Sequence, residues 1–136
     1  MLVTDIVDVT KTRSRIFLDG SFAFVLYPGE LRKYHIEKDK EMNDAAYSEL
    51  MENVLPKRAK LRSMNLLQSR EYTEKQLMDK LLQGGYPEQI AEEALEYVKS
   101  YHYIDDDRYA ATYIEYHVDS KSRQRITQDL MKKGIS

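Results

Sequence analysis

The sequence predicts an α+β fold, in which a small N-terminal three-stranded antiparallel sheet with a covering helix precedes tandem three-helix repeats. Residues 3–9 alternate apolar and polar side chains, as a half-buried strand does, whereas from residue 57 onward the apolar spacing is helical. A capped helical unit also occurs twice, at a constant offset of 49 positions. We therefore expect three parts: a sheet-and-helix domain in residues 1–56, a first repeat in 57–104 and an incomplete second repeat in 105–136.

The sheet is expected to lie in the N-terminal part. Residues 14–18 and 21–26 are rich in β-forming side chains, and Asp19-Gly20 between them suits the positive φ angles of a tight hairpin turn. Together with residues 3–9 they give three strands. Because three strands alone are only marginally stable, an apolar element must cover one face.

Two helical stretches follow the strands. Pro28 favours a short helix up to Tyr34, because the first turn of a helix tolerates proline. Asn43 can cap a longer helix over residues 44–55, and Pro56 is expected to interrupt or restart the helix. This longer helix is the predicted cover of the sheet. Its expected inner face carries Ala46, Leu50 and Val54.

The repeated unit comprises residues 73–86 and 122–135. Thr73 and Gln76 have the spacing of a capping box, and Gly85 can supply the left-handed residue that ends a helix. A constant offset across cap, apolar face and helix end indicates a duplicated structural unit. The matched pairs are Thr73 and Ser122, Leu77 and Ile126, Leu81 and Leu130, Leu82 and Met131, Gly85 and Gly134, and Tyr86 and Ile135.

Each repeat is expected to contain three helices. Residues 59–69 and 87–100 flank the repeated unit in the first copy, and Asp105-Asp106-Asp107 begins the second copy, where carboxylates complement the helix dipole. The second copy stops after two helices, with Ser136 at the position equivalent to Pro87, so we expect the chain to be a fragment or to lack a final helix. The expected inward residues are Leu61, Met64, Leu67 and Gln68 in the first helix, and Ile90, Ala94, Leu95 and Val98 in the third.

The sequence shows no catalytic constellation. The histidines His35, His102 and His117 lie far apart, and Gly84-Gly85 is followed by proline rather than by a phosphate-loop lysine. There is no cysteine, no stretch of about 20 apolar residues and no signal peptide. We therefore expect a cytoplasmic protein that is not an enzyme, with no metal, no cofactor and no contact with membranes.

Charge is distributed in blocks along the chain. The net charge is -3 for residues 1–56, +4 for 57–85, -6 for 86–118 and +3 for 119–136, so the basic blocks contain the two copies of the repeated unit. Such alternation suits a partner that presents both signs, or a nucleoprotein. Within the acidic block, the six tyrosines from Tyr97 to Tyr116 are expected to form the joint between the repeats rather than to stack on bases.

The basic residues have two interpretations. Each taken singly is a solvated helix face, whereas their recurrence at matched places in both repeats favours a common binding surface for a partner or DNA. Arg70 and Arg108 are expected at junctions between helices. The binding candidates are Arg58, Arg62, Arg70, Lys75, Lys80, Arg108, Lys121, Arg123, Arg125, Lys132 and Lys133.

The segment from Leu66 to Ile114 resembles the RecX family of regulators of the RecA recombinase. The resemblance rests on the Arg70–Tyr72–Thr73 junction, the Leu77 to Tyr86 helix and its Gly-Gly-Tyr end, and the Tyr103 to Ala110 hinge. It continues through the second copy and covers roughly residues 57–136. The N-terminal sheet is similar to an extra β segment that some longer members carry.

The resemblance implies a monomeric, non-catalytic modulator of homologous recombination, DNA repair and the SOS response. Such proteins bind in the groove of the RecA filament on single-stranded DNA, and they inhibit ATP hydrolysis, coprotease activity and strand exchange. The partners implied are the RecA filament and, more weakly, the single-stranded DNA within it. Two alternatives stay open, an independent DNA-binding helical module and a plain protein scaffold.

Overall fold

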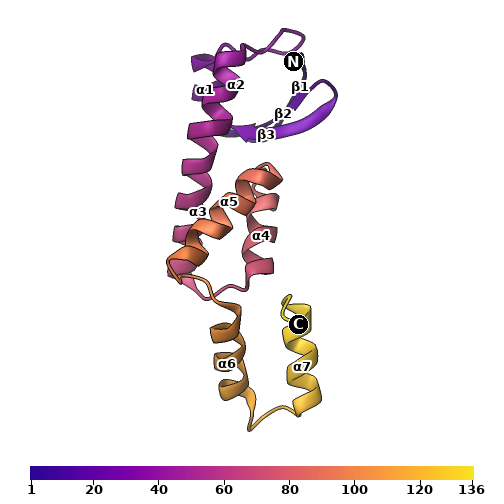
Figure 1. Cartoon of the computed structure of the whole chain (residues 1–136). Helices are drawn as coiled ribbons and strands as arrows, with labels where there is room; N and C mark the ends of the chain where they lie inside the picture. The colour runs from indigo at the N-terminus through magenta and orange to yellow at the C-terminus, as the bar shows by residue number, and fades with distance from the viewer.

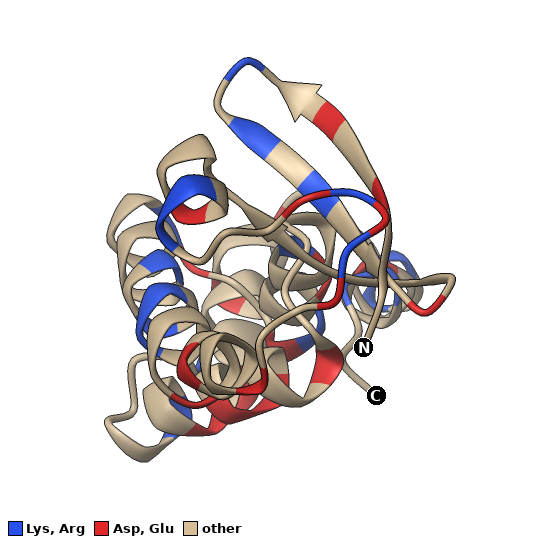
Figure 2. Ribbon diagram, turned by 90° about the horizontal axis from the view of Figure 1, so that it is seen from above, with Lys and Arg blue, Asp and Glu red and all other residues tan.

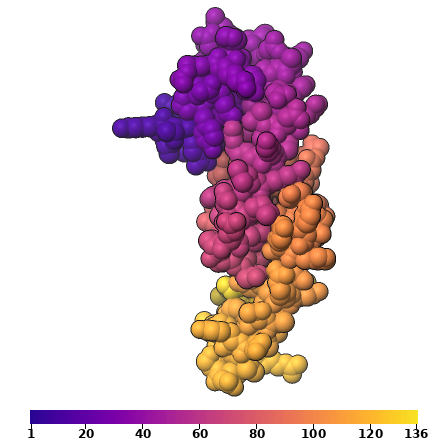
Figure 3. All heavy atoms as spheres, turned by 90° about the vertical axis from the view of Figure 1, so that its left-hand side faces the viewer, coloured from indigo at the N-terminus to yellow at the C-terminus, as the bar shows by residue number.

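The computed structural model describes every residue from Met1 to Ser136, and it begins with the expected sheet. Strands β1 (Val3–Thr10), β2 (Arg13–Leu18) and β3 (Ser21–Leu26) are antiparallel in the order β1-β2-β3. Asp19 and Gly20 both have positive φ, as the predicted hairpin turn requires. The β1–β2 hairpin projects sideways from the helices, as Figure 3 shows. The α+β prediction is therefore confirmed.

Helices α1 (Pro28–Lys33) and α2 (Asp44–Glu49) follow the sheet. As predicted, the side chain of Asn43 caps α2 by accepting a hydrogen bond from the Ala46 N–H at 3.1 Å. Phe24 of β3 lies beside Tyr47 of α2, with ring centroids 6.2 Å apart. Both aromatic side chains join the apolar core under the sheet. The helix that begins at Asp44 therefore covers the sheet.

The expectation that Pro56 interrupts or restarts the helix is correct only in part, because the chain stays helical but its α-helical hydrogen bonding changes directly before Pro56. A π-helical segment, η1 (Leu50–Val54), leads directly into α3 (Leu55–Ser69), and one long helix results (Figure 1). In η1 the Leu55 N–H bonds to the carbonyl of Leu50, five residues back instead of four. The wider turn makes room for the proline ring, which would meet a carbonyl in a regular α-helix. The division of the chain at residues 56 and 104 stays a prediction.

The first repeat packs α4 (Glu74–Gln83) and α5 (Glu88–Ser100) against α3. The expected inner face of α3 is only partly correct. Met64 and Leu67 are half-buried against the core, whereas Leu61 is 60% exposed and Gln68 is exposed. The buried residues in the middle of α3 are Ala59, Ser63 and Leu66. Small side chains at 59 and 63 leave room for α5. The Ser63 hydroxyl donates to the Ala59 carbonyl at 2.8 Å, so it is satisfied inside the helix. The inner face of α5 is as expected, with Ile90, Ala91, Ala94 and Val98 buried and Leu95 half-buried.

The two copies of the repeated unit have matching ends. Thr73 and Ser122 each accept a hydrogen bond from the N–H three residues later, at 3.1 Å. Gly85 and Gly134 have φ of 87° and 94°, as the sequence predicts. Leu82 and Met131 contradict their expected place on the apolar face, because 42% and 63% of their surfaces are exposed. The other apolar pairs at the offset, Leu77 with Ile126 and Leu81 with Leu130, are buried.

The second repeat continues the molecule away from the sheet with α6 (Asp106–His117) and α7 (Arg123–Lys132), which gives an elongated shape (Figures 1 and 3). Asp105 caps α6 by accepting from the Arg108 N–H at 3.1 Å, so the three aspartates form a helix start as expected. The buried residues of this repeat are Ile126 and Leu130 of α7. Its helices therefore bury little apolar surface.

The joint between the repeats carries polar contacts, and the expectation that tyrosine rings fill it is correct only for Tyr109 and Tyr113, which are half-buried and line a hollow with Glu71. The Thr73 hydroxyl donates to the Lys133 carbonyl at 2.5 Å, and the Glu74 N–H donates to Asp106 at 2.9 Å. The Tyr101, Tyr103 and Tyr116 rings are instead exposed, by 55%, 45% and 82%. Backbone groups at helix ends lack partners within their own helix. Here a side chain of each repeat bonds to such a group at a helix end of the other repeat.

Candidate partner-binding surface

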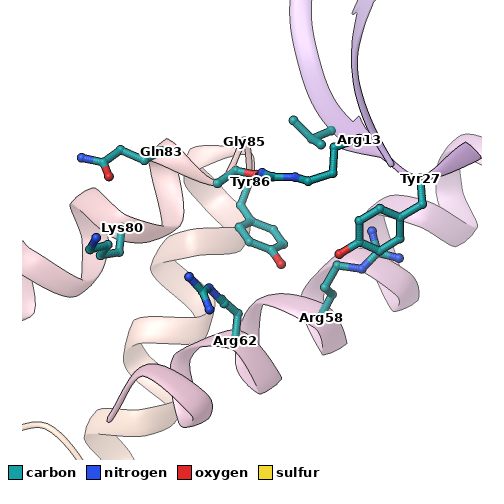
Figure 4. A pocket seen from close by; sticks show the side chains of 10 residues that line it. Arg13, Tyr27, Arg58, Arg62, Lys80, Gln83, Gly85 and Tyr86 are labelled. Carbon is teal, nitrogen blue, oxygen red and sulfur yellow. The ribbon is translucent and has the colours of Figure 1, made fainter. Parts of the chain in front are cut away.

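Arg58, Arg62 and Lys80 are the candidates that the fold brings to a single hollow (Figure 4). Arg58 and Arg62 lie one turn apart on α3, and Lys80 lies on α4. Tyr86, directly after the glycines that end α4, also lines the hollow. Arg62 and Lys80 are exposed. These two are therefore free to meet a ligand or a partner.

Arg58 is the most enclosed of the three. Its guanidinium forms a bidentate pair with the Glu30 carboxylate of α1 and lies 4.3 Å from the centroid of the Tyr27 ring. Burial acts to lower the pKa of Arg58, but the bonds to Glu30 outweigh it and raise the pKa above its ordinary value. Arg58 therefore joins α1 to α3 and stays charged.

Arg70 and Arg108 lie at helix junctions, as expected from their place in the sequence. Arg70 follows α3, and its guanidinium lies 3.9 Å from the centroid of the Tyr72 ring. Arg108 donates to the backbone carbonyls of His102 at 2.9 Å and Tyr103 at 3.4 Å, and its other contact is Glu71 at 3.5 Å. These contacts occupy Arg108 within the chain.

Lys121, Arg125 and Lys133 gather around Asp129 and Tyr113 of the second repeat. Lys121 Nζ lies 2.9 Å and Arg125 Nε 3.1 Å from the Asp129 carboxylate, and the Tyr113 hydroxyl donates to it at 2.8 Å. Lys133 Nζ lies 5.6 Å from the centroid of the Tyr113 ring. Hydrogen bonds from Lys121 first, then from Tyr113 and Arg125, hold the pKa of Asp129 well below its ordinary range. This cluster connects α6 with α7.

The remaining candidates differ in how free they are. Lys75 bonds to Asp79 at 3.1 Å, four residues along the same helix. Arg123 and Lys132 of α7 are exposed and form no ion pair within the chain. With Arg62 and Lys80, they are the candidates best placed to contact another molecule. Figure 2 shows basic and acidic residues interspersed along the helices and the hairpin.

Sequence reasoning missed three residues of the hollow. Arg13 of β2 donates from Nη2 to the Gly84 carbonyl at 3.2 Å, and Tyr27 and Tyr86 line the same hollow. Arg13 lies in a block with net negative charge, and 71 positions separate it from Gly84. No local pattern could pair these two residues. No three histidine or acidic side chains come together as a metal site, and no helix is both long and apolar enough to span a bilayer.

Comparison with known proteins decides the family. Models for the first and second three-helix domains of RecX match residues 59–97 and 105–136. The regulatory protein RecX of Caldanaerobacter subterraneus subsp. tengcongensis is 34% identical over 137 residues, which cover 99% of this chain and 70% of that protein. The chain belongs to the RecX family.

Other RecX relatives give the same result. Regulatory proteins RecX of Clostridium perfringens and Clostridium beijerinckii are 29% and 30% identical, and the chain spans 58% and 59% of their lengths. A crystal structure of regulatory protein RecX superposes with a TM-score of 0.62 at 27% identity, covering 99% of this chain and 68% of that one. The resemblance predicted from the sequence is thus confirmed. These RecX proteins are named as regulatory proteins.

Proposed function

We propose that this RecX chain is a monomeric cytoplasmic regulator that binds the RecA filament on single-stranded DNA. Binding inhibits ATP hydrolysis, coprotease activity and strand exchange, with no catalysis by the chain itself. The observation that carries the proposal is the match of both three-helix domains to RecX family models. Because the chain spans 58% to 70% of the relatives' lengths, its retention of their activity is part of the proposal.

The surface supports a nucleoprotein partner better than bare DNA. The free cations Arg62, Lys80, Arg123 and Lys132 lie on α3, α4 and α7, at separate points along an elongated molecule. Acidic side chains separate these points along the sequence, with a net charge of -6 over residues 86–118. A filament presents both phosphates and protein charges, so a surface of mixed sign is complementary to it.

The test follows ATP hydrolysis by RecA on single-stranded DNA as the chain is added. We expect inhibition that saturates with concentration, and we expect Arg123→Glu with Lys132→Glu to raise the half-inhibitory concentration about tenfold or more. Lys57→Glu reverses an exposed charge on α3 and serves as the matched control. The Caldanaerobacter relative is assayed in parallel. Inhibition by that relative together with none by this chain in excess would contradict the proposal.

The alternative, an independent DNA-binding module, is favoured by one surface feature. Tyr101 and Tyr103 form an exposed aromatic stack with ring centroids 5.6 Å apart, and Tyr97 lies edge-on to Tyr101 at 5.1 Å. Lys60 Nζ lies 5.0 Å from the Tyr97 centroid. Such a stack can hold unpaired bases. This alternative predicts DNA affinity without RecA that falls steeply with salt. Titration of a fluorescent oligonucleotide at several salt concentrations separates the two functions.

A further inference from the structure

A basic hollow lies where the sheet meets the first repeat. It has a volume of about 460 Å³, and Arg13, Arg58, Arg62 and Lys80 line it together with Tyr27 and Tyr86. The cations come from β2, α3 and α4, and no acidic side chain belongs to the lining. Figure 4 shows Tyr86 pointing between Arg62 and Tyr27, with Arg13 above it and Lys80 on the side away from Tyr27.

The charges in this hollow are largely uncompensated. Glu30 neutralises Arg58 from behind the lining. Arg13 is held by the neutral carbonyl of Gly84, which fixes the guanidinium but leaves its charge. Arg62 and Lys80 have no carboxylate within ion-pair distance anywhere in the chain. Three positive charges therefore face one space without a counter-charge.

The phenols add hydrogen-bond donors to the same space. Tyr86 is half-buried, and neither its hydroxyl nor that of Tyr27 has a hydrogen-bond partner in the chain. Burial first, and then the neighbouring Tyr27, raise the pKa of Tyr86, although Arg58, Arg62 and Arg13 act against this. The Tyr86 hydroxyl therefore keeps its proton near neutral pH and can donate to an anion.

A solvated helix face does not explain this arrangement. Solvation of a helix face explains why a residue such as Lys57 is exposed on α3 outside the hollow. It does not explain why cations from three different elements line the same hollow. Like charges one turn apart on a helix, such as Arg58 and Arg62, repel one another. A bound anion would offset that repulsion. The planar forks of arginine match the oxygens of phosphate, and lysine adds a point charge.

We propose that this hollow is a binding site for a phosphate group, held by Arg13 and Arg62 with Lys80 at the rim and the Tyr86 hydroxyl as a further donor. The phosphate is carried by a free nucleotide or by the backbone of single-stranded DNA. Because the site lies within one chain, the proposal is independent of RecA binding. An assay on the isolated chain therefore tests it separately from the proposed function.

The experiment measures binding to the purified chain by isothermal titration calorimetry at low salt. The probes are inorganic phosphate, a nucleoside triphosphate, and an oligothymidylate without terminal phosphates. We expect saturable binding of at least one probe. Arg62→Gln should weaken it about tenfold, and Tyr86→Phe about threefold, because each removes a donor to the anion. Lys57→Gln removes the same charge from the same helix outside the hollow and should leave the affinity unchanged.

The probes also identify the source of the phosphate. Tight binding of the triphosphate with none of the oligothymidylate assigns a nucleotide, and the reverse assigns the DNA backbone. The proposal fails if no probe binds, or if Arg62→Gln and Lys57→Gln have equal effects. It also fails if an oligoglutamate peptide binds the hollow while all three phosphate probes do not. Thermal melting of each variant confirms that the fold is intact.

Discussion

Gly85 satisfies two constraints at a single residue. Its φ of 87° is left-handed, and a β-carbon built on it would lie 2.2 Å from Cγ2 of Val25. The backbone at the end of α4 therefore packs so closely against strand β3 that no side chain fits at this position. Gly20 in the β2–β3 turn has a similar φ of 84°, but a β-carbon there would meet no atom within 4 Å. A side chain at Gly20 would therefore introduce backbone strain alone, whereas a side chain at Gly85 would introduce backbone strain and a steric clash.

We expect Gly85→Ala to lower the free energy of unfolding by roughly 2–4 kcal/mol, because left-handed backbone strain and overpacking against Val25 add. Gly20→Ala should cost only the backbone strain, about 1 kcal/mol. Urea denaturation of both variants and the parent measures the difference. Equal losses in the two variants would contradict the close contact between α4 and the sheet.

At the scale of elements, Asp129 connects the helices of the second repeat. Its carboxylate receives bonds from Lys121, Tyr113 and Arg125, and α6 and α7 bury little apolar surface to replace them. These bonds hold the pKa of Asp129 in the folded chain below the ordinary value of 3.8. A carboxyl whose folded pKa is lowered contributes stability above its unfolded pKa, and this stability is lost as pH falls toward the folded pKa.

We therefore expect Asp129→Asn to destabilise α7 at about pH 7 and to have less effect near pH 2, because at that pH the carboxyl of the unfolded chain is protonated and the folded chain gains less from keeping Asp129 ionised. Hydrogen exchange of the α7 amides, measured at both pH values, reports this locally. Asp119→Asn is the control, because Asp119 is exposed and forms no ion pair. A stability difference between parent and Asp129→Asn that is the same at both pH values would contradict the assignment.

Elements were predictable where their signals are local. The caps at Thr73 and Ser122 and the left-handed Gly85 and Gly134 depend on a few neighbouring residues, and all four are as expected. The buried face of α3 depends instead on which side α4 and α5 occupy, which spacing alone cannot decide. The π segment before Pro56 was also unpredictable, because it depends on the helix being continuous across the boundary with the first repeat.

At the scale of the molecule, the basic hollow shows why the site was only partly predicted. Helical spacing places Arg58 and Arg62 on one side of α3, and the charge pattern included them and Lys80 among eleven binding candidates. Arg13 and Tyr27 enter only because the sheet packs on the end of α4, a contact between distant segments. Long-range packing of this kind leaves no trace in any window of the sequence. Whether these residues bind a partner stays a prediction.

The orientation of the two repeats depends on a small number of polar contacts, and Arg108 makes three of them. Its guanidinium meets the His102 and Tyr103 carbonyls at the end of the first repeat and Glu71 between α3 and α4. These contacts are exposed, so each adds under about 1 kcal/mol to stability. They nevertheless connect α6 to the end of the first repeat, so we expect them to restrict the direction in which α6 leaves it. Arg108 is therefore expected to affect shape more than stability.

We expect Arg108→Ala to widen the distribution of distances between the repeats while the melting temperature stays nearly constant. The chain has no cysteine, so Lys57→Cys and Gln128→Cys introduce two unique spin-label sites on exposed residues of α3 and α7. Double electron–electron resonance then measures the distribution directly. Arg123→Ala, which removes an exposed arginine without an ion pair, is the matched control in the same labelled background. An unchanged distribution in Arg108→Ala would show that the contacts of Thr73 with Lys133 and of Glu74 with Asp106 orient the repeats without it.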